Sequence, residues 1–186
     1  PYYGVNLIPT DEVVLFSGGD RSMTALDSKS GEQLWRAEHP RSGYRSAEDL
    51  FVIGGQVLAG DVANMTSSGA VAVRDLKTGE LSRTLPADTR MNHFPHHRCY
   101  RSKATERFIM SSRTGIEFCD TETGAWLNNH WARGACLVGI MPCNGLLYAP
   151  SHHCLCFADS QLEGFNALAP ASADISKEPL TRLERG

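Results

Sequence analysis

The sequence of 186 residues predicts an all-β protein, a β-propeller with four four-stranded blades. The main evidence is a strand–turn–strand unit at residues 25–35 whose turn recurs along the chain. Its aspartate returns as Asp27, Asp75 and Asp120, at spacings of 48 and 45 residues. Short apolar runs also come in sets of four, and the turn falls between the third and fourth run of each set. Repeats of roughly 40–50 residues with several short strands each are typical of propellers.

The repeated turn has the form Asp-x-x-Ser/Thr-Gly. Asp27 can accept a hydrogen bond from the backbone two residues on, and Gly31 can adopt the positive φ that ends such a turn. Gly79 and Gly124 occupy the same position in the next two copies. A longer fourth copy starts at Asp159, 39 residues after the third. The first three glycines are therefore expected at positive φ.

The strands of the first two units follow from apolar runs between turn residues. In unit one we expect strands at 5–8, 13–17 and 23–27, followed by a fourth strand that carries Trp35. In unit two we expect strands at 50–53, 57–60, 70–75 and 81–85.

The third and fourth units follow the same order. In unit three we expect strands at 97–101, 107–112, 116–120 and 125–129, with 102–106 as a connection. In unit four we expect strands at 135–141, 146–149, 154–159 and 165–168. Asn144-Gly145 lies between two apolar runs, which is a strong hairpin signal. The expected blade limits are about 1–45, 46–88, 89–131 and 132–168, with 169–186 as a linker or tail.

Two fold interpretations compete. One is a β-sandwich with chance Asp-x-x-Thr-Gly hairpins. The fixed place of the hairpin within each set of four strands favours the propeller. Four such units make half of a ring of about eight blades, and a propeller must close to cover its edges. We therefore expect a fragment or a cleaved half, completed by a second segment of the same parent chain or by another copy.

Composition narrows the function classes. A formal charge of −3, without a basic run, gives no reason to expect nucleic-acid binding. No apolar stretch is long enough to span a membrane, and the chain begins at Pro1 without a Met or a signal peptide. Six cysteines favour an oxidising compartment, so the expected location is extracytoplasmic, either periplasmic or secreted. Two of them, Cys119 and Cys143, are expected beside turns at the bottom of the propeller, either reduced or weakly paired.

Ala25 to Trp35 fits the pattern A-x-D-x-x-[TS]-G-x-x-x-W. This segment resembles the pyrroloquinoline-quinone-type (PQQ-like) propeller repeat, in which tryptophans dock between neighbouring blades. The match is full in unit one, whereas the tryptophan position is Arg83 in unit two and Asn128 in unit three. The resemblance implies the propeller fold, and relatives that serve outer-membrane assembly bind proteins and no quinone.

The second half resembles large, mostly uncharacterised propeller proteins of planctomycete-type bacteria. The segments that carry this resemblance are His96-His97-Arg98-Cys99-Tyr100, Arg113 to Phe118, Trp131 to Cys136, Asn144-Gly145-Leu146 and Gly164 to Leu168.

The family name does not imply the quinone cofactor here. Quinone-dependent alcohol dehydrogenases hold their quinone with an adjacent Cys-Cys disulfide, a stacking tryptophan, a calcium ion and an aspartate base. No two cysteines are adjacent in this chain, and no acidic residues stand out as a calcium ligand set. PQQ is therefore not supported, and no cofactor is required.

The topology gathers four cysteines on the top face of two adjacent blades, with histidines beside them. We expect Cys99 and Cys136 at equivalent positions on neighbouring inner strands, with Cys154 and Cys156 close by. Three interpretations remain open, namely a disulfide among these four, buried thiols beside hydrogen-bonded histidines, or a zinc or copper site. A disulfide needs Cα atoms about 4.4–6.8 Å apart. We rank Cys99–Cys154 first, with Cys136 free or paired to Cys156.

The metal alternative has its own ligand set. Adjacent histidines on a strand point to opposite faces, so one histidine of each pair could bind the metal. The candidate ligands are His97, Cys99, His152 and Cys154.

The leading functional hypothesis is a non-catalytic scaffold or binding module, part of a larger extracytoplasmic protein. No complete catalytic set stands out, and propellers offer a rigid face with variable loops. The alternative is a redox or metal-dependent, quinoprotein-like oxidoreductase subunit with a His/Cys site on the top face.

Overall fold

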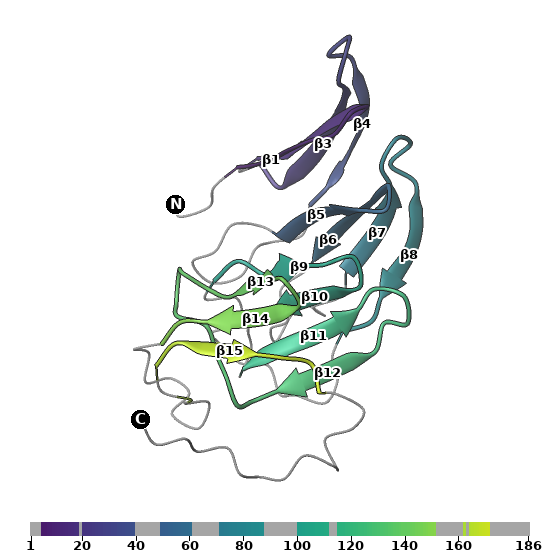
Figure 1. Ribbon diagram of the computed structural model, residues 1–186. Coiled ribbons are helices and arrows are strands. Elements are labelled where there is room, and N and C mark those ends of the chain that lie inside the picture. Colours follow the sequence, from purple (N-terminus) through teal and green to yellow (C-terminus); the bar gives the residue numbers. More distant parts are fainter. Residues whose placement is uncertain are drawn as a thin grey trace, which may run out of the picture.

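The computed structural model describes residues 5–18, 20–39, 49–60, 71–87, 100–111, 115–151, 162 and 164–171. Within these residues all strands form antiparallel sheets, and each sheet is a simple meander (Figure 1). Three sheets have four strands and one has three. This arrangement confirms the all-β prediction, and the first three sheets have the expected order of four strands.

The sheets are numbered as blades in chain order. Blade 1 contains β1 (Asn6–Pro9), β2 (Val13–Ser17), β3 (Ser22–Asp27) and β4 (Gln33–Glu38). Blade 2 contains β5 (Asp49–Ile53), β6 (Gln56–Gly60), β7 (Val71–Asp75) and β8 (Leu81–Leu85). Blade 3 contains β9 (Lys103–Ala104), β10 (Phe108–Ser111), β11 (Ile116–Asp120) and β12 (Trp126–Asn129). Blade 4 contains β13 (Met141–Cys143), β14 (Leu146–Ala149) and β15 (Asn166–Leu168).

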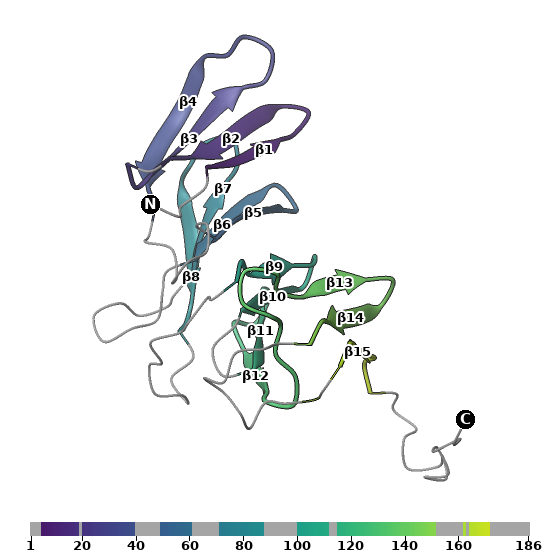
Figure 2. The ribbon, with the colours of Figure 1, turned by 90° about the vertical axis from the view of Figure 1, so that its left-hand side faces the viewer.

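The four blades lie side by side in an arc. Figure 2 shows them in chain order, with the inner strands β1, β5, β9 and β13 on the inner side of the arc. The inner strands of neighbouring blades touch, as β1 contacts β5 and β9 contacts β13. This is the blade arrangement of a β-propeller.

In the part of the chain that the structure describes, the core consists of three apolar clusters, one between each pair of neighbouring blades. Successive side chains of a strand point to opposite faces of its sheet, so each middle blade supplies apolar side chains to two clusters. In β6, for example, Val57 and Ala59 pack toward blade 1, while Leu58 packs toward blade 3. The third cluster joins Met110 and Ile116 of blade 3 to Leu147 of blade 4. Inter-blade packing therefore holds the arc together.

The repeated turns have the predicted geometry. Gly31, Gly79 and Gly124 lie at φ of 75°, 73° and 71°. Within the turns, one carboxylate oxygen of the aspartate accepts two backbone N–H groups. For Asp27 the donors are Lys29 and Ser30, at 2.9 and 2.7 Å.

These hydrogen bonds stabilise the charged form of the carboxylate. In the third turn they lower the pKa of Asp120 to about 2, mainly through the backbone N–H of Thr123, with the Arg107 guanidinium adding to the effect. The same backbone bonds lower the pKa of Asp27 and Asp75. The aspartate is therefore the residue that fixes each turn.

The expected inner strand of unit three was misplaced. Tyr100 and Arg101 are not in a strand, and the inner strand β9 lies in the segment 102–106 that we expected to be a connection. The pairing of Lys103 with Met110 and of Ala104 with Ile109 sets this position.

Unit four also differs from the expectation. Of the expected strand 135–141, residues 135–140 form a loop, which is closed by a bridge between Ala135 and Gly139, and only Met141 lies in a strand. Leu137 within the loop has a φ of 70°. Cys136 therefore does not lie on an inner strand. The segment expected as the fourth strand is β15, which pairs directly with β14 and so takes the third position. The expected strand 154–159 lies outside the described residues.

No helix among the described residues is long and apolar enough to cross a membrane.

Candidate binding site between the third and fourth blades

The interface between blades 1 and 2 is closed by a tryptophan. Trp35 on β4 is buried, and its indole N–H donates a 2.8 Å hydrogen bond to the carbonyl of Leu76 in the turn of blade 2. The ring lies directly over Gly79, where an added Cβ would come within 2.6 Å of Trp35 Cγ. The outer strand of one blade thus docks on the turn of the next.

The interface between blades 2 and 3 uses different residues for the same contact. Arg83, at the position of the repeat's tryptophan, donates a 3.1 Å hydrogen bond from Nη1 to the carbonyl of Glu122 in the turn of blade 3. Pro86 lies over Gly124, with its Cδ at 2.7 Å from an added Cβ. The indole N–H of Trp126 donates to the carbonyl of Pro86 at 2.8 Å.

Blade 3 lacks the tryptophan of the repeat. Asn128 stands in the sequence where blade 1 has Trp35 and blade 2 has Arg83. In blade 3, however, Asn128 pairs with Glu117, whereas Leu127 pairs with Phe118 and shares the face that borders blade 4. No tryptophan or arginine of the outer strand therefore takes the docking position at the interface between blades 3 and 4.

A cavity of about 570 Å³ lies at this interface. Its wall on blade 3 includes Phe108 and Phe118, whose rings meet edge to face with centroids 6.0 Å apart. Its wall on blade 4 is formed by the β13–β14 hairpin and the end of β15, and it includes Leu146 and Leu168. Ala169 and Pro170 close one side. A cavity of this size with mainly apolar walls suits an apolar side chain or a small apolar ligand.

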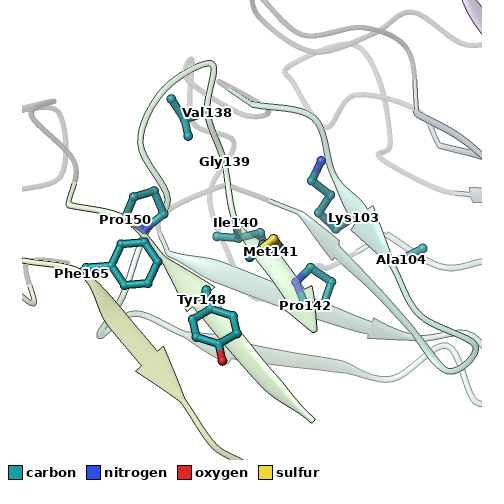
Figure 3. A pocket seen from close by; sticks show the side chains of 10 residues that line it. All are labelled: Lys103, Ala104, Val138, Gly139, Ile140, Met141, Pro142, Tyr148, Pro150 and Phe165. Atoms are coloured by element: carbon teal, nitrogen blue, oxygen red, sulfur yellow. The ribbon is translucent and has the colours of Figure 1, made fainter. Parts of the chain in front are cut away.

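A second cavity, of about 530 Å³, borders the inner strand of blade 4 (Figure 3). Tyr148 and Phe165 form one side, with their ring centroids 6.0 Å apart, and Met141 lies between them and blade 3. Among the described residues that line it, Lys103 is the one with a charged side chain. Blade 4 is thus flanked by apolar cavities.

Polar contacts join the residues just before β9 to the inner strands of blades 1 and 2. Arg101 donates a hydrogen bond to Oδ1 of Asn6 on β1, and Asn6 Nδ2 donates to Ser17 Oγ at 3.2 Å. The backbone N–H of Ser102 donates to Oδ1 of Asp49 on β5 at 3.3 Å. These contacts tie the start of blade 3 to blades 1 and 2.

Most sequence-predicted site residues lie outside the described residues. This applies to His97, Cys99, His152, Cys154 and Cys156, so the metal and disulfide hypotheses stay predictions. The described residues contain no group of three or more His, Cys, Asp or Glu side chains that could hold a metal ion.

The remaining three cysteines are separated from one another in the fold. Cys136 is half-buried in the loop that precedes β13, Cys119 is buried between blades 2 and 3, and Cys143 is an exposed free thiol beside the Asn144-Gly145 turn. The turn-side positions of Cys119 and Cys143 agree with the expectation. The inter-blade cavity was not predicted from the sequence.

Comparisons with known proteins agree with this architecture. The family described as outer membrane protein assembly factor BamB matches residues 5–137. BamB from Moraxella catarrhalis superposes with a TM-score of 0.52 and 21% identity, over 80% of this chain and 42% of that chain. The chain therefore spans less than half the length of that BamB.

The computationally designed Ika4 protein superposes with a TM-score of 0.54 and 14% identity, over 91% of this chain and 92% of that one. A comparison with curated proteins finds no match. At these identities the solved structures show the fold alone. The family match covers most of the chain and includes the repeated turns, the docking tryptophan and three of the four blades. The chain belongs to the BamB family of PQQ-like β-propeller repeat proteins.

Proposed function

We propose that the chain is a non-catalytic propeller scaffold and binding module that takes an apolar segment of a partner protein between blades 3 and 4. The observation that supports this most is the cavity of about 570 Å³ at that interface. An aromatic or large aliphatic side chain that enters such a pocket contributes strongly to binding, because it leaves water completely. The walls of the pocket lie on strands, which fixes its shape.

The place of the module in a larger protein is also a proposal. The family is named for outer membrane protein assembly, which supports an extracytoplasmic location and a protein partner. We place four blades within residues 1–168 and a linker or tail at 169–186. A further segment of the parent chain, or another copy, would complete the ring.

The proposed function needs no quinone. The tryptophans support this, because Trp35 and Trp126 are engaged between blades through the carbonyls of Leu76 and Pro86. Trp131 is 75% exposed and stands outside the inter-blade core. No described tryptophan is therefore placed to stack on a cofactor in an enclosed site.

Filling the cavity tests the binding site. The probe is anilinonaphthalene sulfonate, whose fluorescence rises in apolar pockets. Ala169 is exposed and lines the cavity, so Ala169→Trp should fill the space and weaken probe binding by about tenfold or more. Ala125→Trp changes an equally exposed alanine outside the cavity and should leave binding unchanged. Equal binding by both variants would contradict the proposed site.

Elemental analysis of the purified chain separates this function from the redox or metal-dependent alternative. The proposal predicts no stoichiometric metal. Zinc or copper in a one-to-one ratio would contradict it.

A further inference from the structure

The first blade exposes an apolar sheet face of the kind that the other blades bury. We call the side of blade 1 that points away from blade 2 its leading face. Leu7, Phe16 and Thr24 are paired across β1, β2 and β3, so they share this face, on which Leu7 is exposed, Phe16 half-buried and Thr24 buried. Leu7 is 67% exposed, whereas its neighbour Asn6, on the opposite face, is only 4% exposed. Leu34 on β4 is also exposed.

The turn of blade 1 supports the same conclusion. An added Cβ at Gly79 would meet Trp35 of the preceding blade, and one at Gly124 would meet Pro86 of the preceding blade. At Gly31, which has the same φ, an added Cβ would meet nothing within 4 Å. The turn of blade 1 therefore has the same backbone geometry as the turns of blades 2 and 3, but no described residue of another blade covers its glycine.

The opposite end of the arc presents the matching surface. We call the side of blade 4 that points away from blade 3 its trailing face. Met141, Tyr148 and Ala167 are paired across β13, β14 and β15 and share this face. Met141 is 54% exposed, in contrast to Leu147, which packs against blade 3. The cavity of about 530 Å³ in Figure 3 borders this face at Met141, Tyr148 and Phe165, and it extends along β13 to Lys103 and Ala104 of blade 3.

The internal interfaces specify how these two faces would meet. At the internal interfaces, the leading face of each blade packs on the trailing face of the blade before it. Inner strands are also in contact there, since β1 contacts β5 and β9 contacts β13. By the same rule β1 would lie beside β13, with Leu7 at the cavity beside that strand. An exposed leucine and an apolar cavity at corresponding positions are complementary.

We propose that the leading face of blade 1 binds the trailing face of blade 4 of a second copy of this chain, so that two copies complete one ring. The chain itself carries both surfaces, which makes the contact heterologous, and such contacts form closed rings when the rotation closes. Two copies give the ring of about eight blades that the repeat suggests. The inference rests on the proposed scaffold function and names the partner that completes it.

The mass of the chain in solution, measured by light scattering after size exclusion, tests this assembly. The unmodified chain should have twice the mass of one copy. Leu7→Glu and Met141→Glu each bury an unpaired carboxylate in the contact, and each should raise the dissociation constant of the dimer by about a hundredfold or more. Leu81→Glu is the matched control, since Leu81 is also 54% exposed but lies on the outer strand β8. It should remain dimeric. Circular dichroism checks that each variant is folded.

Mixing the two variants identifies the type of contact. A dimer of Leu7→Glu with Met141→Glu has one interface free of both substitutions, so the mixture should recover dimer that neither variant forms alone. A monomeric unmodified chain, or a Leu7→Glu chain that stays dimeric, would overturn the proposal. Neither result would affect probe binding between blades 3 and 4, and a failure of probe binding would not change the mass. The two proposals therefore fail separately.

Discussion

Replacing Trp35 with alanine should lower the free energy of unfolding by about 3–5 kcal/mol. The side chain is buried between blades 1 and 2, over Gly79, and its indole N–H is bonded to the carbonyl of Leu76. The substitution removes apolar contact from both blades, leaves a cavity and deprives the carbonyl of its donor. Urea denaturation followed by circular dichroism measures the change.

Trp131→Ala is the matched control for this substitution. Trp131 is 75% exposed, and a surface change of this kind usually stays within about 0.5 kcal/mol. If the two alanine variants were equally stable, Trp35 would not be holding the first two blades together.

Gly79→Ala should cost about 2–5 kcal/mol, while Gly31→Ala should cost only about 1–2 kcal/mol. The backbone strain is the same at both, because their φ values are 73° and 75°. A methyl group at Gly79 would also come within 2.6 Å of the Trp35 ring, whereas the space at Gly31 is open. The difference between the two costs therefore reports the docking of one blade on the next.

This comparison is made in the Leu7→Glu chain, which is expected to be monomeric, so that no second copy covers Gly31. Thermal or urea unfolding gives both values. Equal costs for the two substitutions would mean that the tryptophan does not press on the turn of blade 2.

The turns and the strands beside them could be predicted from the sequence. Strands 13–17, 81–85, 116–120 and 146–149 have the expected limits. Each lies next to a turn whose residues fix both φ and hydrogen bonding, as Asn144-Gly145 does for β14 with φ of 51° and 74°. Where local chemistry determines the backbone, the sequence pattern was sufficient.

The inner strands of blades 3 and 4 could not be located in this way. The run from Ala135 to Met141 is apolar enough for a strand, but Leu137 has positive φ and Gly139 lies against Tyr100, where an added Cβ would come within 3.2 Å of the ring. The loop is held by tertiary contact with blade 3. Leu137 and Val138 are exposed within it, so their apolar character did not indicate burial.

The same difference between local and tertiary effects applies to the candidate site. The sequence analysis proposed cysteines and histidines as site residues because of their chemistry. Most of these residues lie outside the described residues. The inter-blade cavity is lined mainly by apolar side chains of two blades. Its place depends on how blades 3 and 4 pack against each other, which the chemistry of single residues does not indicate.

The central claim is that residues at the outer strands dock blade 1 on the turn of blade 2 and blade 2 on the turn of blade 3. Hydrogen exchange of the indole N–H groups tests it most directly. The chain has three tryptophans, so their indole signals can be assigned by single substitutions. Trp35 should exchange slowest, because its N–H is buried and bonded across the first interface, and Trp126 should follow, with its N–H bonded to Pro86. Trp131 should exchange nearly as fast as a free indole, since it is 75% exposed. Exchange of Trp35 as fast as that of Trp131 would contradict the docked propeller.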